Sequence, residues 1–158
     1  MTTTALIRSE SRWIAVCGFA VAAMAAAPRL AAAQLIIVTP QSINFPSSDP
    51  DTVPVISSPT VRVLFVAQGP PARPWTITVR ADGPLVSGAS TIPISAVSWI
   101  SAPSPPFVNG TLSTVAQTIA TGSGSAIERG DVTFRFTNSW NYNVGTYTQT
   151  ITFTLTSP

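Results

Sequence analysis

The chain has 158 residues, of which 45% are hydrophobic and only 9% are charged, and it contains no histidine. Its length suits one domain. Residues 34–158 carry five arginines, five acidic residues and no lysine, which excludes a basic surface for nucleic acid or anionic lipid.

The first 33 residues have the organisation of a secretory signal peptide. Arg8 and Arg12 lie in a short polar segment before an apolar run, Trp13 to Ala27. Three alanines, of which the last is Ala33, supply the small residues of a cleavage site. The run is short for a membrane span, which needs about 20 apolar residues. The sequence therefore predicts a leader over residues 1–33, cleaved after Ala33, with an uncleaved anchor as the alternative. We expect an exported protein, at the cell surface, secreted or in the periplasm, with no membrane span after processing.

The domain is expected over residues 34–158. It has no disulfide, because the only cysteine, Cys17, lies in the leader. Gln34–Thr39 is a short apolar strand candidate that ends at Pro40, and Ser42–Phe45 continues it after a bend. Residues 46–59 contain four prolines and several serines, which predicts a surface loop with a short extended piece at Val53–Ile56 as an option.

Three central segments alternate between apolar and polar residues with a period of two. They are Thr60–Ala67, Trp75–Ala81 and Asp131–Asn138. In the first, the inward residues are expected to be Val61, Val63 and Phe65, but Leu64 and Val66 on the other face are apolar too, so partial cover of both faces is the alternative. The expected inward residues of the other two are Trp75, Ile77, Val79, Ala81, Val132, Phe134 and Phe136. These segments predict strands with one face in a core.

A weaker strand is expected at Thr91–Trp99, where Pro93 indicates an edge or a bulge, and another at Thr111–Ala120, where a helical turn is the less favoured alternative. Residues 101–110 are a proline-rich loop, and residues 121–130 are expected to be a flexible connection.

The C-terminal segment from Gly145 to Pro158 has the clearest pattern. Every even position from Thr146 to Thr156 is threonine, and the odd positions are Tyr147, Gln149, Ile151, Phe153 and Leu155. This pattern predicts a long antiparallel strand with its odd positions toward the core. With about seven such strands and no amphipathic helix, the predicted fold is a single all-β domain, an immunoglobulin-like antiparallel β-sandwich.

Few residues of the domain can carry chemistry. Histidine is absent, as is cysteine after processing, which removes the commonest general base, the usual zinc ligands and the thiol nucleophile. Asp49 and Asp51 offer weak calcium ligands, but a solvated loop explains them better. We therefore expect no catalytic residue, no cofactor and no metal, and a protein that is not an enzyme.

Aromatic residues near strand ends offer a binding surface. Trp99, Trp140 and Tyr142 could stack on sugar rings or contact another protein if exposed, although such residues more often cap the end of a sandwich, which is the favoured interpretation. Tyr147 resembles the tyrosine that pins a corner of immunoglobulin-like sandwiches. Arg129–Asp131 spells the Arg-Gly-Asp tripeptide of some integrin ligands, although a strand beginning at Asp131 after a loop that ends at Gly130 explains it equally.

Two segments resemble known families. Gly145–Thr148 followed by Thr152–Pro158 looks like the C-terminal end of WxL-type cell-wall-associated domains, with Phe153-Thr154-Leu155 in place of Trp-x-Leu, and Trp75–Ile77 resembles their earlier tryptophan segment. The same ending is similar to that of pilus and spore-coat-type subunits. The resemblance implies a bacterial surface β-sandwich with a cell-wall polymer, or other copies of itself, as partner.

The leading hypothesis is a non-enzymatic, extracytoplasmic structural or adhesive protein of the cell surface, with self-association as one form of that role. The alternative is a carbohydrate-binding module that uses exposed aromatics, and a carboxylate hydrolase ranks last. The arm from Gln34 to Phe45 is expected either to pair within its own sandwich or to add as a strand to a neighbouring copy.

Overall fold

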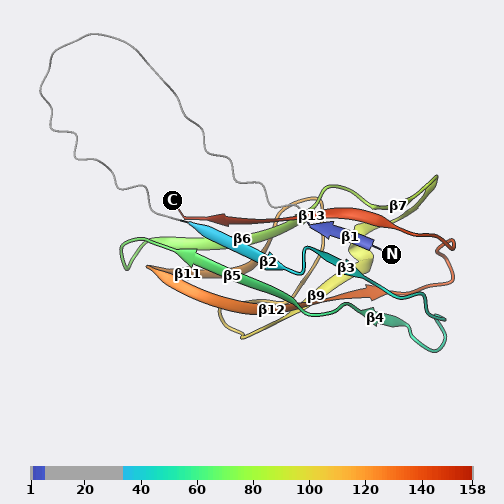
Figure 1. Cartoon of the computed structure of the whole chain (residues 1–158), viewed down its shortest axis with the longest axis horizontal. Helices are drawn as coiled ribbons and strands as arrows, with labels where there is room; N and C mark the ends of the chain where they lie inside the picture. Colours follow the sequence, from blue (N-terminus) through green and yellow to red (C-terminus); the bar gives the residue numbers. More distant parts are fainter. Residues whose placement is uncertain (1, 6–33, 158) are drawn as a thin grey trace, which may run out of the picture.

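The computed structural model describes residues 2–5 and 34–157, which form two β-sheets stacked as layers (Figure 1). These residues include one 3-10 turn, Ile94–Ala96, and no α-helix. The layers share one hydrophobic core, in which the rings of Phe65 and Trp75, one from each sheet, lie 4.7 Å apart. The all-β prediction is confirmed, and the two sheets fit a β-sandwich. The apolar run of the predicted leader and its cleavage site lie outside the described residues.

The first sheet, sheet A, has the strand order β11-β6-β13-β1-β3, with β7 paired to β13 and to β8. Its strands are β1 (Thr2–Ala5), β3 (Ser42–Asn44), β6 (Pro74–Ala81), β7 (Leu85–Ser87), β8 (Ser90–Ile92), β11 (Gln117–Ser123) and β13 (Thr148–Thr156). All of its pairs are antiparallel except β1 with β13, which is parallel.

The second sheet, sheet B, is antiparallel and has the order β10-β9-β12-β5-β2, with β4 paired to β12. Its strands are β2 (Leu35–Thr39), β4 (Val55–Ser57), β5 (Val61–Ala67), β9 (Val97–Ala102), β10 (Gly110–Thr111) and β12 (Ala126–Thr137). The N-terminal arm of the domain thus passes from sheet B to sheet A between β2 and β3. Within this chain the arm is an internal element, because β2 pairs with β5.

The alternation of the sequence fixes which side chains enter the core. The predicted inward residues of β5, β6 and β12 are all buried, as are Tyr147, Ile151 and Phe153 at the C-terminus. Gln149 and Leu155 on the same side are half-buried. Thr154, on the opposite face of β13, is exposed. This burial confirms the predicted inward faces. The prediction holds because a period of two puts neighbouring side chains on opposite faces of a strand.

The number of strands was predicted wrongly: residues 2–5 and 34–157 form thirteen strands rather than about seven. Pro93 splits the expected strand 91–99 into β8, the 3-10 turn and β9. Short stretches such as β4 and β10 count as strands because long neighbours pair with them. The expected flexible connection over residues 121–130 is also wrong. Only residues 124 and 125 lie between β11 and β12, and Gly124 turns the chain with a φ of 75°.

Three glycines let large rings lie flat across neighbouring backbone. A Cβ on Gly110, Gly122 or Gly130 would come within 2.4 Å of a ring atom of Trp99, Trp75 or Phe107, respectively. Gly110 and Trp99 are direct partners across β10 and β9, and so are Gly122 and Trp75 across β11 and β6. The missing side chain therefore makes the room that the ring fills.

Candidate functional site

A cleft of about 580 Å³ opens at one end of the sandwich, between the loop that joins β3 to β4 and the link that joins β12 to β13. Both connections lie at the same end of the molecule, on the right in Figure 1. The residues around the cleft are mostly aromatic or small and polar, and none is basic. They are Phe45, Pro46, Ser47, Ser48, Asp49, Pro50, Ile56, Ile92, Phe136, Asn138, Ser139, Trp140, Tyr142, Asn143, Val144, Gly145, Thr146 and Tyr147.

Hydrogen bonds tie the two walls of the cleft together. The Asn138 side-chain amide donates to the carbonyls of Ser48 and Val53, at 2.9 and 3.2 Å, and the backbone N–H of Asn138 donates to Pro54 at 2.9 Å. The Trp140 indole N–H donates to Asp51 Oδ1 at 3.1 Å. Asn138 and Trp140 of the β12–β13 link thus hold the β3–β4 loop against that link.

The aromatic rings of the cleft differ in exposure. Phe136 lies between Phe45 and Tyr142, with ring centroids 5.9 and 5.8 Å away, and these rings belong to the core or its margin. Trp140 is 68% exposed, while Tyr142 is half-buried. Two of the three predicted surface aromatics thus line the same cleft, and Trp140 alone of them presents most of its surface to solvent.

Trp99 corrects the predicted surface. It is 1% exposed, and its indole N–H donates to the Val108 carbonyl at 2.8 Å. Gly110 across the strand leaves room for the ring to lie inside the sandwich. The expectation that Trp99 lies on an open surface with Trp140 and Tyr142 is therefore wrong.

Tyr147 lies at the back of the cleft and has the geometry expected of a corner residue. Its ring is buried, and its hydroxyl donates to the Asn143 carbonyl, four residues upstream, at 2.9 Å. That bond fixes the end of the link that carries Trp140.

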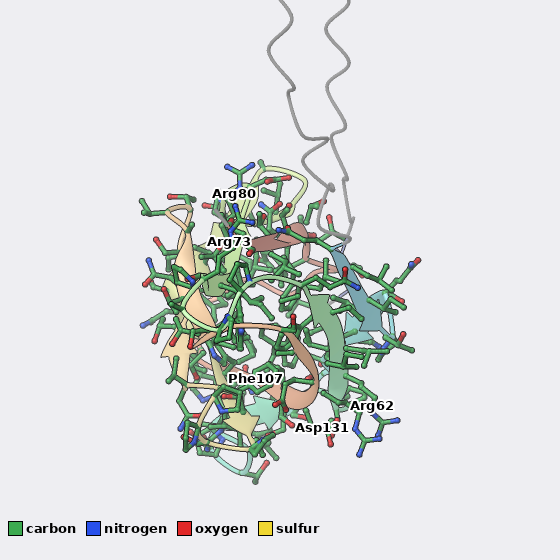
Figure 2. The ribbon with its side chains drawn as sticks, turned by 90° about the vertical axis from the view of Figure 1, so that its left-hand side faces the viewer. Arg62, Arg73, Arg80, Phe107 and Asp131 are labelled. Atoms are coloured by element: carbon green, nitrogen blue, oxygen red, sulfur yellow. The ribbon has the colours of Figure 1, made fainter. Side chains whose placement is uncertain are left out.

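The Arg-Gly-Asp tripeptide lies inside β12 rather than at the end of a loop. Gly130 is buried beneath the ring of Phe107, and the Asp131 carboxylate pairs with the Arg62 guanidinium at 3.3 Å (Figure 2). The backbone of Asp131 is paired on both sides, with β5 and β9. The loop predicted to end at Gly130 is therefore wrong, and a paired strand holds the tripeptide.

The two aspartates of the β3–β4 loop differ in their partners: Asp49 bonds within the loop, whereas the Asp51 carboxylate accepts the Trp140 indole N–H of the link. Asp49 Oδ1 accepts the backbone N–H of Asp51 at 2.9 Å, and the Asp49 carbonyl accepts those of Thr52 and Val53. Among residues 2–5 and 34–157, no three acidic side chains come together as metal ligands would. Within the same residues, no helix has the length and the apolar character needed to cross a membrane.

A second feature is the position of β1 in sheet A. Residues 2–5 lie between β13 and β3 (blue in Figure 1), parallel to Thr148–Ile151 and antiparallel to Ser42–Asn44. A small crevice beside β3 and β13 is lined by core side chains, namely Val38, Ile43, Val61, Phe134, Ile151 and Phe153, together with Pro40, Gln41 and Ser42. Sequence reasoning missed this strand because it assigned residues 2–5 to the leader.

No protein-family description matches this chain, and no curated protein matches it. The resemblance to WxL-type domains and to pilus or spore-coat-type subunits therefore rests on the residues of the chain alone.

Proposed function

We propose that this chain is a non-enzymatic, extracytoplasmic structural or adhesive protein of the cell surface, and that its copies associate by strand addition. One observation supports this most strongly. The position between β3 and β13 is filled by residues 2–5, which precede the predicted cleavage site after Ala33. A processed chain has lost that strand and needs another in its place.

A missing strand inside a sheet leaves backbone groups without partners, which costs free energy and favours pairing with another strand. The strands on either side present backbone N–H and C=O groups that require partners, and such edges are templates for strands from other chains. The core residues Ile43 of β3 and Ile151 of β13 lie beside this position and line the small crevice next to it. A strand that enters there would gain both backbone hydrogen bonds and an apolar contact.

The proposed donor is the arm of a second copy. Strand β2 lies at the edge of sheet B, and its outward residues Leu35 and Ile37 are 49% and 41% exposed. An apolar edge strand at the start of the processed chain can exchange between copies, as in strand swapping. Repeated head-to-tail exchange would produce a filament or a lattice rather than a closed dimer.

An immunoglobulin-like topology is part of the same proposal. The bond from the Tyr147 hydroxyl to the Asn143 carbonyl supports it, because that corner is typical of such sandwiches. The leader, the small number of charges and the threonine-rich outer face of β13 support a location outside the cytoplasm.

Sedimentation velocity on two forms of the chain tests the proposal. The full chain should be a monomer, because residues 2–5 fill the position in the same molecule. Residues 34–158 should form oligomers whose mass rises with concentration. A folded and stable monomer of residues 34–158, as judged by circular dichroism, would refute association by strand addition.

A third form guards against simple misfolding. It consists of residues 34–158 followed by a flexible linker and a copy of residues 1–8. The linker must run back along the nine residues of β13, a distance of about 30 Å. This form should be a folded monomer even though residues 1–33 are absent from its N-terminus. If it associates as strongly as residues 34–158, then the position between β3 and β13 is not what drives association.

A further inference from the structure

We propose that the cleft at the end of the sandwich is a binding site for a neutral oligosaccharide, and that Trp140 is its stacking platform. The site is separate from the strand position in sheet A. The proposal depends on the exposure of one ring, on the polar groups around it and on the charge of the cleft.

Trp140 has the exposure that a stacking platform needs. Its side chain is 68% exposed in a link whose neighbours are bonded in place: Asn141 N–H donates to Ser139 Oγ at 3.2 Å, and Tyr142 N–H donates to the Ser139 carbonyl at 3.2 Å. Asp51 holds the edge of the indole through its N–H. A large aromatic surface that is fixed but left open to water favours a ligand with a flat apolar face, such as a pyranose ring.

The polar groups of the cleft match sugar hydroxyls. Serine hydroxyls, the Asn143 side chain and the Asp49 carboxylate lie around the same opening, and each can donate to or accept from a hydroxyl group. A volume of about 580 Å³ is of the size that holds small ligands. Because the walls are tied through Asn138, a ligand would bind with little ordering of the loops.

The charge of the cleft selects against other ligands. No arginine lines it, so it offers no partner for a phosphate, a sulfate or an acidic sugar. A quaternary ammonium group would suit the carboxylates of Asp49, which lines the cleft, and Asp51, which is bonded to Trp140, but such a group is usually enclosed by several open rings. Here Trp140 is mostly exposed, whereas Tyr142 is half-buried and Phe136 is buried. A neutral saccharide fits this combination better than either charged class.

Calorimetric titration with soluble probes tests the site. Cellohexaose, maltohexaose and hexa-N-acetylchitohexaose represent neutral oligosaccharides of different composition and linkage, and choline chloride represents the cationic class. At least one hexasaccharide should bind, and Trp140→Ala should weaken that binding by about tenfold or more, which corresponds to the loss of roughly 1.4 kcal/mol. Ile127→Ala is the matched control, because Ile127 is 76% exposed on β12 and does not line the cleft.

Asp51→Asn separates the two classes of ligand. The amide oxygen of asparagine can still accept the indole N–H, so oligosaccharide binding should change by less than about threefold, whereas binding that depends on the negative charge should fall. The proposal is overturned if no hexasaccharide binds at millimolar concentration, if Trp140→Ala binds as well as the native chain, or if choline alone binds.

Discussion

Strand β13 runs through two halves of sheet A that are built differently. Residues Ile151–Thr156 pair antiparallel with β6, and β6 pairs in turn with β11. Residues Thr148–Ile151 pair parallel with β1, and β3 lies beyond it. The first half draws its strands from residues 74–156, whereas the second half needs residues 2–5.

The difference shows which part of sheet A can form without residues 2–5. The half that contains β6 and β11 is complete within the predicted domain, so the predicted cleavage would not change it. The half that contains β3 depends on a strand that the predicted cleavage removes. Mutations in the two halves should therefore respond differently to the presence of residues 1–33.

The largest expected effect is in the complete half. Phe153→Ala should lower the free energy of unfolding by about 3–5 kcal/mol, because Phe153 is 4% exposed and the change leaves a cavity. The loss should be about the same in the full chain and in residues 34–158. Denaturant titration of both forms measures it, and a loss below about 1 kcal/mol would mean that Phe153 does not face the core.

The second effect tests the half that depends on β1. Ile43→Ala should destabilise the full chain by about 2–5 kcal/mol, since Ile43 is 6% exposed on β3. In monomeric residues 34–158 the loss should be clearly smaller, because β3 has lost β1 beside it. Equal losses in the two forms would show that β3 is fixed without residues 2–5, and the contrast between the halves would fail.

A third effect tests the ring packing of the complete half. Gly122→Ala should cost about 1–3 kcal/mol, because its Cβ would stand 2.2 Å from the Trp75 ring and force the ring to move. Gly83→Ala is the control, since its nearest neighbour is the end of the flexible Gln149 side chain, 3.2 Å away. Thermal unfolding of the two variants should separate them, and similar midpoints would contradict the close packing.

The smallest effect belongs to the outer face of β13. Thr154→Ala should cost about 1 kcal/mol or less, within the range of β-propensity differences, because Thr154 is exposed. Measured beside Phe153→Ala in the same titration, it shows the effect of the face alone. A cost close to that of Phe153→Ala would place a second layer over this face.

The inward faces of the long strands were predictable because alternation is a local property. Residues two positions apart share one face of a strand, so the burial of Val63 and Phe65 in β5, and of Ile77 and Val79 in β6, follows from their spacing. The number of strands was not predictable, because β4 and β10 are strands only through their pairing with β12 and β9. The sequence of β10 itself, Gly-Thr, does not contain that information.

The candidate sites were predictable only in part. Trp140 and Tyr142 follow the end of β12, and their place in a connecting link was visible in the sequence. Trp99 was misplaced because its burial depends on Gly110, eleven residues away in the chain and opposite it in the sheet. The role of residues 2–5 depends on a space between β3 and β13, and no local pattern of three threonines and an alanine indicates such a space.

Amide hydrogen exchange along β13 in dilute residues 34–158 tests the proposed open position most directly. Neighbouring amides of a strand point to opposite sides, and the Thr150 carbonyl accepts the Asp82 N–H on the side of β6. If the position is empty, the amides of Gln149 and Ile151, on the side of β1, should therefore exchange faster than those of Thr152 and Thr154, on the side of β6. Their protection should return as the protein concentration rises, and it should be present at every concentration in the full chain. Equal protection along β13 in a dilute monomer would contradict an open strand position.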